Sequence, residues 1–241
     1  QAVQELKQDL GSYAAAAQLQ QRPAPEGGGL FKDHWWRFWI PYGAQVETFG
    51  RPHMELPDGS LHWYDVQPLP HARHMQQMQS WDCAFKGKQT SDYVAGLAAG
   101  VAYPHIYVLD QVHAKMDIVQ TIQAIQQLSD EYPKAHAKLI EDKANGPAVM
   151  QLLRDKVHGL LAYNPEGNKV ARASALAPIV EAGNVWLPHP KIAPWVWDFI
   201  AEFSQFPYAA YDDRVDALGQ LVQWALDRMG RKKKVKARAR A

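Results

Sequence analysis

Four acidic residues lie in three widely separated segments of the 241-residue chain: Asp82, Glu141, Asp213 and Asp216. The local sequence pattern puts each of them at the end of an apolar strand or at the start of a helix. Carboxylates are costly to bury at such positions unless something neutralises them. A divalent cation held by oxygen ligands does this, and it is also the usual apparatus for hydrolysing phosphodiester bonds. The four residues therefore indicate a metal-dependent nuclease site.

The first two acids each have a plainer interpretation. Asp82 could be an ordinary edge residue of a strand, although the alternation points its apolar neighbours to one face and Asp82 to the other. Glu141 could pair with a nearby lysine, Lys143 or Lys86. Against this, Glu141 stands at the exit of a buried strand, which is where open α/β sheets bind their ligands. We expect both acids to be functional.

The third segment contains Asp212, Asp213 and Asp216, and it has a stronger alternative. Acids favour helix N-termini, where they cap the first turn and complement the helix dipole. Asp212 or Asp213 could do only that. Asp216 lies a turn further in, among apolar residues, so its face of the helix should be partly buried. Asp213 and Asp216 are three residues apart and are expected to share that face.

Composition limits the alternatives. A hydrophobic content of 47% is enough for one sizeable core, and the formal net charge is only +1. The basic charge is concentrated in residues 231–241, which read as a solvated tail or as a contact for phosphates or an acidic partner. The single cysteine, Cys83, cannot form an intramolecular disulfide, and no apolar run approaches the length of a membrane span. A glycine-rich phosphate loop ending in Gly-Lys-Ser/Thr is absent.

The elements that must position the acids are predicted from periodicity and from turn residues. An N-terminal helix, 1–21, is followed by a Pro- and Gly-rich linker, and the aromatic segment 31–39 should bury against a core. Strands are expected at 80–85, 92–101, 105–113, 138–141 and 160–163, with a further short extended piece at 185–188. Helices are expected at 117–132, 147–157, 171–181, 193–206 and 213–229.

This order of elements predicts a mixed sheet. Three consecutive strands form a meander, and right-handed helical crossovers then add parallel strands. The fourth strand can lie beside the first, which places Asp82 and Glu141 on neighbouring strands. The last helix can then cross the sheet and bring Asp213 and Asp216 to the same place.

At these residues the chain resembles the C-terminal nuclease domain of the large terminase subunit of tailed bacteriophages. The segments that carry the resemblance are 11–32, Trp81-Asp82 through Ser91-Asp-Tyr93, Ile140-Glu-Asp-Lys-Ala-Asn-Gly146, Asn164-Pro165 through Lys169 with Arg172, Gly183-Asn-Val-Trp-Leu-Pro188, Phe206-Pro207, and Asp212-Asp-Arg-Val-Asp-Ala217. The resemblance covers most of the chain, and its specificity comes from the order and spacing of these segments together. The family commonly has histidine where this chain has Tyr211, which leaves open which acid of the last motif binds metal.

The resemblance implies an α/β, RNase H-like fold with a mixed five-stranded sheet flanked by helices. The implied divisions are an N-terminal helix and linker at 1–29, the nuclease domain at 30–229, and a basic, disordered tail at 230–241. The implied activity is a double-strand DNA endonuclease that cuts concatemeric viral genomes during packaging. The implied setting is the cytoplasm of an infected bacterium, outside the mature virion. The implied partners are double-stranded DNA, a portal protein, a small terminase subunit and an ATPase domain of the same polypeptide, with no membrane.

The corresponding mechanism is metal-assisted, in-line hydrolysis by two Mg²⁺ or Mn²⁺ ions about 3.5–4 Å apart. Asp82 would bridge the ions, Glu141 would serve one, and Asp213 and Asp216 the other. Lys143 could stabilise the developing phosphate charge, or it could form a salt bridge with a nearby acid. Lys169, Arg172 and the basic tail could contact backbone phosphates without reading sequence.

Two other readings remain open from the sequence. The chain could be a different RNase H-like nuclease of the resolvase or transposase type. It could also be a non-catalytic module that docks on DNA or on a portal ring and keeps vestigial acids.

Overall fold

The computed structural model describes residues 29–238 except 57, 84–91 and 143–145, so the expected N-terminal helix and Lys143 lie outside the described residues. The chain separates into two compact units. The first unit combines residues 1–69 and 177–212, and the second combines 70–176 and 213–241. Among the described residues, no helix has the length and apolar character needed to cross a membrane.

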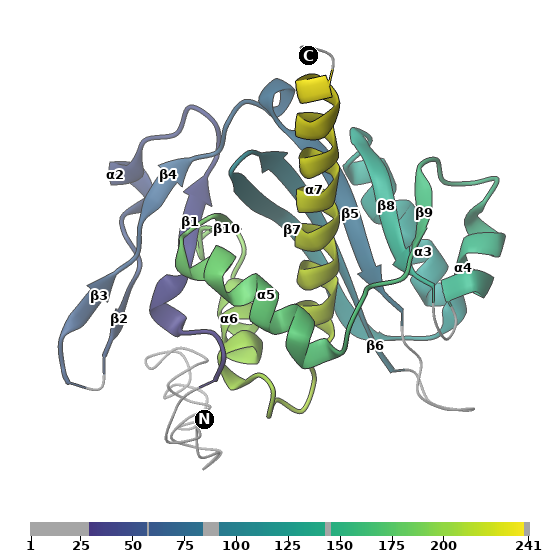
Figure 1. The fold of residues 1–241 in the computed structure, drawn as a ribbon. Coiled ribbons are helices and arrows are strands. Elements are labelled where there is room, and N and C mark those ends of the chain that lie inside the picture. Colours follow the sequence, from purple (N-terminus) through teal and green to yellow (C-terminus); the bar gives the residue numbers. More distant parts are fainter. Residues whose placement is uncertain (1–28, 57, 84–91, 143–145, 239–241) are drawn as a thin grey trace. The chain divides into compact units, whose positions relative to one another are not determined.

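The second unit is built on the five strands that the sequence predicts (Figure 1). They are β5 (Gln76–Asp82), β6 (Asp92–Ala102), β7 (His105–Met116), β8 (Ala135–Glu141) and β9 (Leu160–Tyr163). Their order is β7-β6-β5-β8-β9, in which β5, β6 and β7 form the antiparallel meander. β8 pairs in parallel with β5, and β9 pairs in parallel with β8. The predicted place of the fourth strand beside the first is therefore confirmed.

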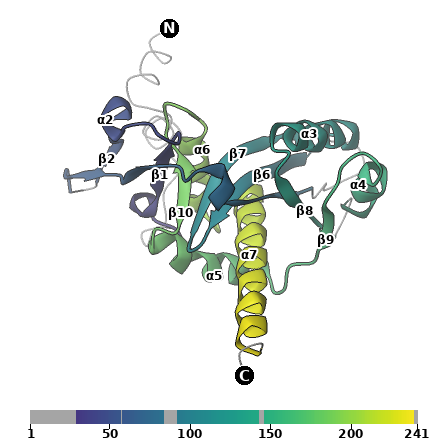
Figure 2. The ribbon, with the colours of Figure 1, turned by 90° about the horizontal axis from the view of Figure 1, so that it is seen from above.

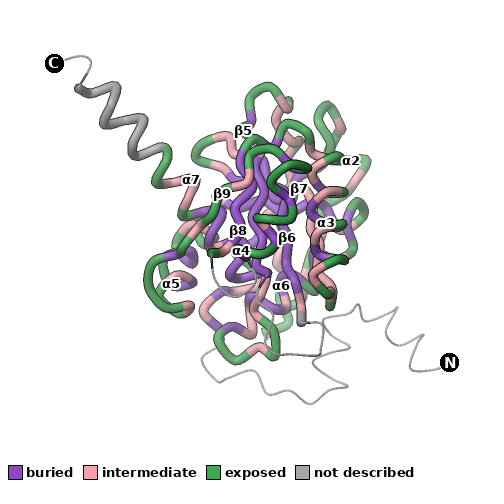
Figure 3. The backbone as a smooth tube through the Cα atoms, turned by 90° about the vertical axis from the view of Figure 1, so that its right-hand side faces the viewer, coloured by how far each residue is buried: buried purple, intermediate pink, exposed green. Residues whose placement is uncertain are grey.

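Helices cover both faces of this sheet (Figure 2). α3 (Ile118–Glu131) and α4 (Gly146–Leu153) pack on one face, and α7 (Asp213–Arg238) packs on the other against β5 and β6. α3 starts at a capping box in which Asp117 and Gln120 satisfy each other's backbone N–H groups. The strands β5, β6 and β8 are largely buried, as their purple colour in Figure 3 shows, whereas no residue of the edge strand β9 is buried. A further helix of this region, α5 (Lys169–Glu181), begins in the second unit and ends in the first.

The first unit has an aromatic core. Its strands β4 (Val66–Pro68), β1 (Arg37–Ile40) and β10 (Val185–Pro188) pair in parallel in that order. It also contains η1 (Asp33–Trp35), α2 (Val46–Phe49), the hairpin of β2 (His53–Glu55) and β3 (Leu61–Trp63), and α6 (Val196–Gln205). Trp36 packs edge-on against Phe199 and Phe203, and Phe38 packs against Tyr64. The expectation that the aromatic segment buries is thus confirmed.

The prediction of five strands is too low for the described residues, because the first unit has the paired strands β4, β1 and β10 in addition to the five strands of the second unit. β1 and β4 are three or four residues long and end at or beside proline, so their sequences carry little strand signal. β5 begins at Gln76 rather than at residue 80, because its pairing with the long strand β6 starts there. α7 continues to Arg238, past its predicted end at residue 229.

Gly96 of β6 lies against the ring of Trp81, and a Cβ atom added there would come within 2.3 Å of that ring. We expect Gly96→Ala to lower the free energy of unfolding by about 1–3 kcal/mol, as overpacking of a core does. Urea unfolding followed by tryptophan fluorescence measures the change. Gly219→Ala is the matched control, because nothing lies within 4 Å of a Cβ at that helical position. An equal loss in both variants would contradict the role given to this contact.

Candidate metal centre

Asp82 and Glu141 are the last residues of two adjacent parallel strands, β5 and β8. The pairing register joins Trp81 to Ile140, so Asp82 and Glu141 follow as the next pair. Neighbouring strands are about 4.8 Å apart, which sets the separation of the two backbones. The pairing of two distant segments therefore brings their acids to one edge of the sheet.

The two acids also point to the same face of the sheet. Trp81 and Ile140 belong to the apolar cluster that β5 and β8 share with Ile125 of α3 and with α4. Side chains alternate between the two faces of a strand, so Asp82 and Glu141 project to the opposite face, which α7 covers. The predicted alternation around Asp82 is confirmed.

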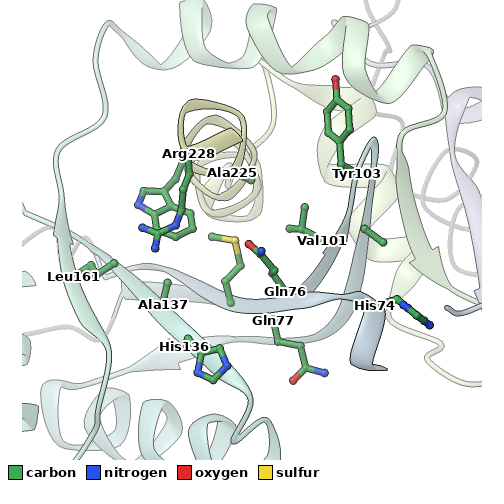
Figure 4. Close-up of a pocket in the computed structure, with 13 residues that line it drawn as sticks. His74, Gln76, Gln77, Val101, Tyr103, His136, Ala137, Leu161, Ala225 and Arg228 are labelled. Atoms are coloured by element: carbon green, nitrogen blue, oxygen red, sulfur yellow. The ribbon is translucent and has the colours of Figure 1, made fainter. Parts of the chain in front are cut away.

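α7 runs antiparallel to β5, which brings its N-terminus to the acidic edge. Ser80 Oγ donates a 2.7 Å hydrogen bond to the carbonyl oxygen of Ala217. Further along the helix, Ala225 and Arg228 line a cavity of about 720 Å³ together with Gln76 at the start of β5 (Figure 4). Asp213 precedes Ala217 by one turn, about 6 Å, in the direction of Asp82. The three elements that carry the four predicted acids thus converge.

The negative charges of Asp82 and Glu141 both act on the thiol of Cys83. Asp82 is buried, with 4% of its surface exposed, whereas Glu141 is partly exposed. The pKa of the Cys83 thiol is raised, first by its burial and then by the negative charges of Asp82 and Glu141. Cys83 is therefore a buried, protonated residue and not a nucleophile. Both carboxylates lie within electrostatic reach of it, and this concentration of negative charge favours a cation.

Asp216 has different partners. It is 8% exposed, and its carboxylate contacts Lys169 Nζ at 2.5 Å and Arg172 Nη2 at 2.6 Å. Both cations come from the first turn of α5. The structure therefore pairs Asp216 with two of the basic residues that were expected to contact phosphates. Asp212 is the last residue of the first unit and Asp213 the first of the next segment of the second.

The donor set fits a hard divalent cation, because the converging groups are carboxylate oxygens. Within the part of the chain that the structure describes, no group of three or more His, Cys, Asp or Glu side chains is close enough to hold a metal ion. The backbone positions converge, then, while the side chains do not yet form a closed ligand shell.

Gly146, the last residue of the segment that carries Glu141, has to be glycine for a steric reason. It is the first residue of α4, and a Cβ atom there would lie 1.8 Å from the carbonyl oxygen of Glu141. Only glycine lets the helix begin this close to the end of β8. The backbone that carries Glu141 is thereby held between its strand and the start of the helix.

Sequence reasoning missed His113, which lies in the same row of the sheet as Asp82. His113 is opposite Ala95, and Ala95 is opposite Asp82. The imidazole stacks on Tyr93 with ring centroids 4.7 Å apart, and its Nε2 has no hydrogen-bond partner. Burial, and then the charge of Arg214, lower its pKa to about 4. The alternation of side chains along the strand predicts which face of the sheet His113 occupies. Only the pairing register shows that His113 lies in the same row as Asp82.

The sequence of residues 79–223 matches a known protein family. The family described as the terminase RNase H-like domain covers residues 79–223, which include Asp82, Glu141, Asp213 and Asp216. The chain belongs to this family. No curated protein matches it.

Two solved structures show the same fold. The large terminase nuclease of the thermophilic phage G20c with bound magnesium is 16% identical, with a TM-score of 0.52 over 83% of this chain and 98% of that one. The large terminase of another thermophilic bacteriophage is 12% identical, with a TM-score of 0.52 over 83% of this chain and 46% of that one. The chain thus has the RNase H-like fold of terminase nuclease domains and spans less than half of the second protein.

The lowered pKa of His113 predicts a pH dependence of stability. Unfolded His113 binds a proton below about pH 6.5, whereas the folded residue stays neutral down to about pH 4. Its contribution is therefore fully present above pH 6.5 and is lost as the pH falls toward 4. We expect the free energy of unfolding of the native protein to fall more between pH 7 and pH 5 than that of His113→Gln. Parallel urea titrations measure this, and identical pH profiles would contradict it.

Proposed function

We propose that this chain is the nuclease domain of a large terminase subunit, and that it hydrolyses double-stranded DNA with Mg²⁺ or Mn²⁺. The observation that carries the proposal is the pairing of β5 with β8, which sets Asp82 beside Glu141 under the N-terminal turn of α7. Membership of the terminase RNase H-like family supports it. The G20c relative with bound magnesium supports the choice of metal.

In this proposal Asp82, Glu141 and Asp213 hold the metal. Bound metal supplies an activated water and stabilises charge on the leaving oxygen. Asp82, which is buried at the end of β5, would supply one carboxylate ligand, and Glu141 and Asp213 would supply the others. Lys143, two residues after Glu141 in the sequence, is assigned to the developing charge on the phosphate.

Asp213, and not Asp216, is assigned as the third ligand. Asp216 forms ion pairs with Lys169 and Arg172. If Asp216 bound a metal instead, these two partly buried cations would lose their carboxylate partner, which is unfavourable. Asp216 instead fixes the first turn of α5 against α7. These ion pairs favour Asp213 over Asp216 in the choice that the sequence leaves open.

The biological setting follows from the family and remains part of the proposal. The chain covers 46% of the second large terminase described above, so an ATPase domain in the same polypeptide is proposed to translocate the DNA. Cutting of concatemeric viral DNA, with a portal protein and a small terminase subunit as partners, would take place in the cytoplasm of the infected host.

Cleavage of supercoiled plasmid tests the activity. We expect nicking and linearisation with Mg²⁺ or Mn²⁺, none with chelator, and a loss of at least about 100-fold in Asp82→Asn, because a metal supplies several kcal/mol of charge stabilisation. Asp130→Asn is the matched control, since Asp130 is an exposed acid of α3 on the far face of the sheet. A folded protein that binds DNA but never cuts it would favour the docking module instead.

The assignment of Asp213 over Asp216 has its own test. We expect Asp213→Asn to abolish the calorimetric signal of Mn²⁺ binding. Asp216→Asn should retain Mn²⁺ binding but lose about 1–3 kcal/mol of stability, because it leaves the partly buried Lys169 and Arg172 without their carboxylate partner. The reverse pattern would make Asp216 the ligand.

A further inference from the structure

The cavity of about 720 Å³ beside residues 224–228 of α7 lies away from the proposed metal centre. All of its lining residues belong to the second unit, and none of them is assigned to the metal. Gln76, at the start of β5, lines it, and Asp82 ends the same strand six residues later. At about 3.3 Å per residue, the cavity and the acidic edge are therefore about 20 Å apart along β5. A molecule bound in this cavity would leave the acids accessible.

The interior of the cavity is largely apolar. Met78, Val101 and Ala137 line it from the adjacent strands β5, β6 and β8, and Ala225 lines it from α7. Figure 4 shows the side chains of Gln76 and Val101 directed from the strands toward the helix. The cavity has the size of a binding site for an organic group of moderate size. It suits an apolar side chain, because removing such a side chain from water is favourable.

Large apolar side chains on the rim of the cavity are exposed to solvent. Tyr103, in the turn between β6 and β7, is 60% exposed, and Leu161 of β9 is 39% exposed. Trp224 of α7 is partly exposed as well. Exposed apolar side chains that gather around a cavity mark a binding surface, whereas single ones need no explanation. The rim and the interior together provide an apolar surface that a partner molecule can cover.

The charge beside the cavity is positive. The exposed Arg228 lines it with its guanidinium 5.0 Å from the centre of the Trp224 ring, and no Asp or Glu of the described residues lines it. After Arg228 the sequence has six further Lys and Arg residues in 231–238 and no acid. Asp227, the acid next to Arg228, lines a different cavity together with Glu166. This separation of charge favours a negatively charged partner on the side of Arg228.

We propose that this cavity docks an acidic peptide segment of a partner protein, which inserts a bulky apolar side chain and directs its acids toward Arg228. An apolar anchor in a pocket, surrounded by polar contacts, supplies most of the affinity in such complexes. Duplex DNA fits the cavity less well, because it binds mainly through its phosphates and has no comparable side chain to insert. The docking site does not depend on the proposed hydrolysis, since the two use different residues.

Fluorescence anisotropy with labelled peptides and the full chain tests the docking site. The acidic probe has a central Trp-Leu pair between runs of Asp and Glu. One control probe has two serines in place of the Trp-Leu pair, and the other has serines in place of the acids. We expect the acidic probe to bind about tenfold or more tightly than the probe without the apolar pair, because burial of a large apolar side chain is lost. The uncharged probe should also bind more weakly, with the difference largest at low salt.

Two variants of the chain locate the peptide. Leu161→Ser removes an apolar side chain from the rim, and Arg228→Glu reverses the charge, so each should weaken the acidic probe by about three- to tenfold. Arg228→Gln is the milder second variant, in case Arg228→Glu does not fold. The matched controls are Leu152→Ser and Arg154→Glu, which change exposed residues of the same unit that do not line the cavity. Both controls should bind the acidic probe like the native protein.

Three outcomes would overturn the proposed docking site. The first is that the folded protein fails to bind the acidic probe at millimolar concentration, or binds all three probes equally. The second is an equal loss of affinity in Leu161→Ser and Leu152→Ser, which would place the peptide outside the cavity. The third is that a short DNA duplex displaces the probe, with Arg228→Glu weakening both ligands and Leu161→Ser neither. That result would make Arg228 a contact for phosphates.

Discussion

The parallel pairing of β5 with β8 is the constraint on which the rest of the site depends. Both strands are buried, and each ends in an acid that follows an apolar residue of the shared core. Burial of Trp81 and Ile140 under α3 and α4 fixes the register, and a slip of one residue would turn the acids to the wrong face. The same hydrophobic contact that stabilises the sheet therefore also places the two carboxylates side by side.

α7 is the third element at the sheet edge that carries Asp82 and Glu141. One polar contact and the antiparallel direction of the helix bring its N-terminus there. The hydrogen bond from Ser80 to Ala217 sets the height of the helix over β5, and Asp213 follows one turn toward the acids. Asp216, only three residues later, reaches the first turn of α5 instead. Two acids of one motif thus serve different purposes. Asp213 begins α7, and Asp216 pairs with the two cations in the first turn of α5.

Much of this arrangement could be predicted from the sequence. The five strands of the second unit, the helix after Asp117 and the neighbourhood of Asp82 and Glu141 follow from periodicity and from the handedness of crossovers. The partners of Asp216 could not be predicted, because Lys169 and Arg172 are more than forty residues away and no local pattern links them. His113 needed the register of two strand pairs, and β1 and β4 are too short to show alternation.

The central claim is that Asp82, Glu141 and Asp213 together hold a divalent metal. The most direct measurement is anomalous diffraction from crystals of this chain grown with Mn²⁺, at the manganese edge. We expect an anomalous peak bounded by the carboxylates of these three residues, with Asp216 still bound to Lys169 and Arg172. A structure in which Mn²⁺ occupies another site, or in which Asp216 replaces Asp213 as its ligand, would contradict it.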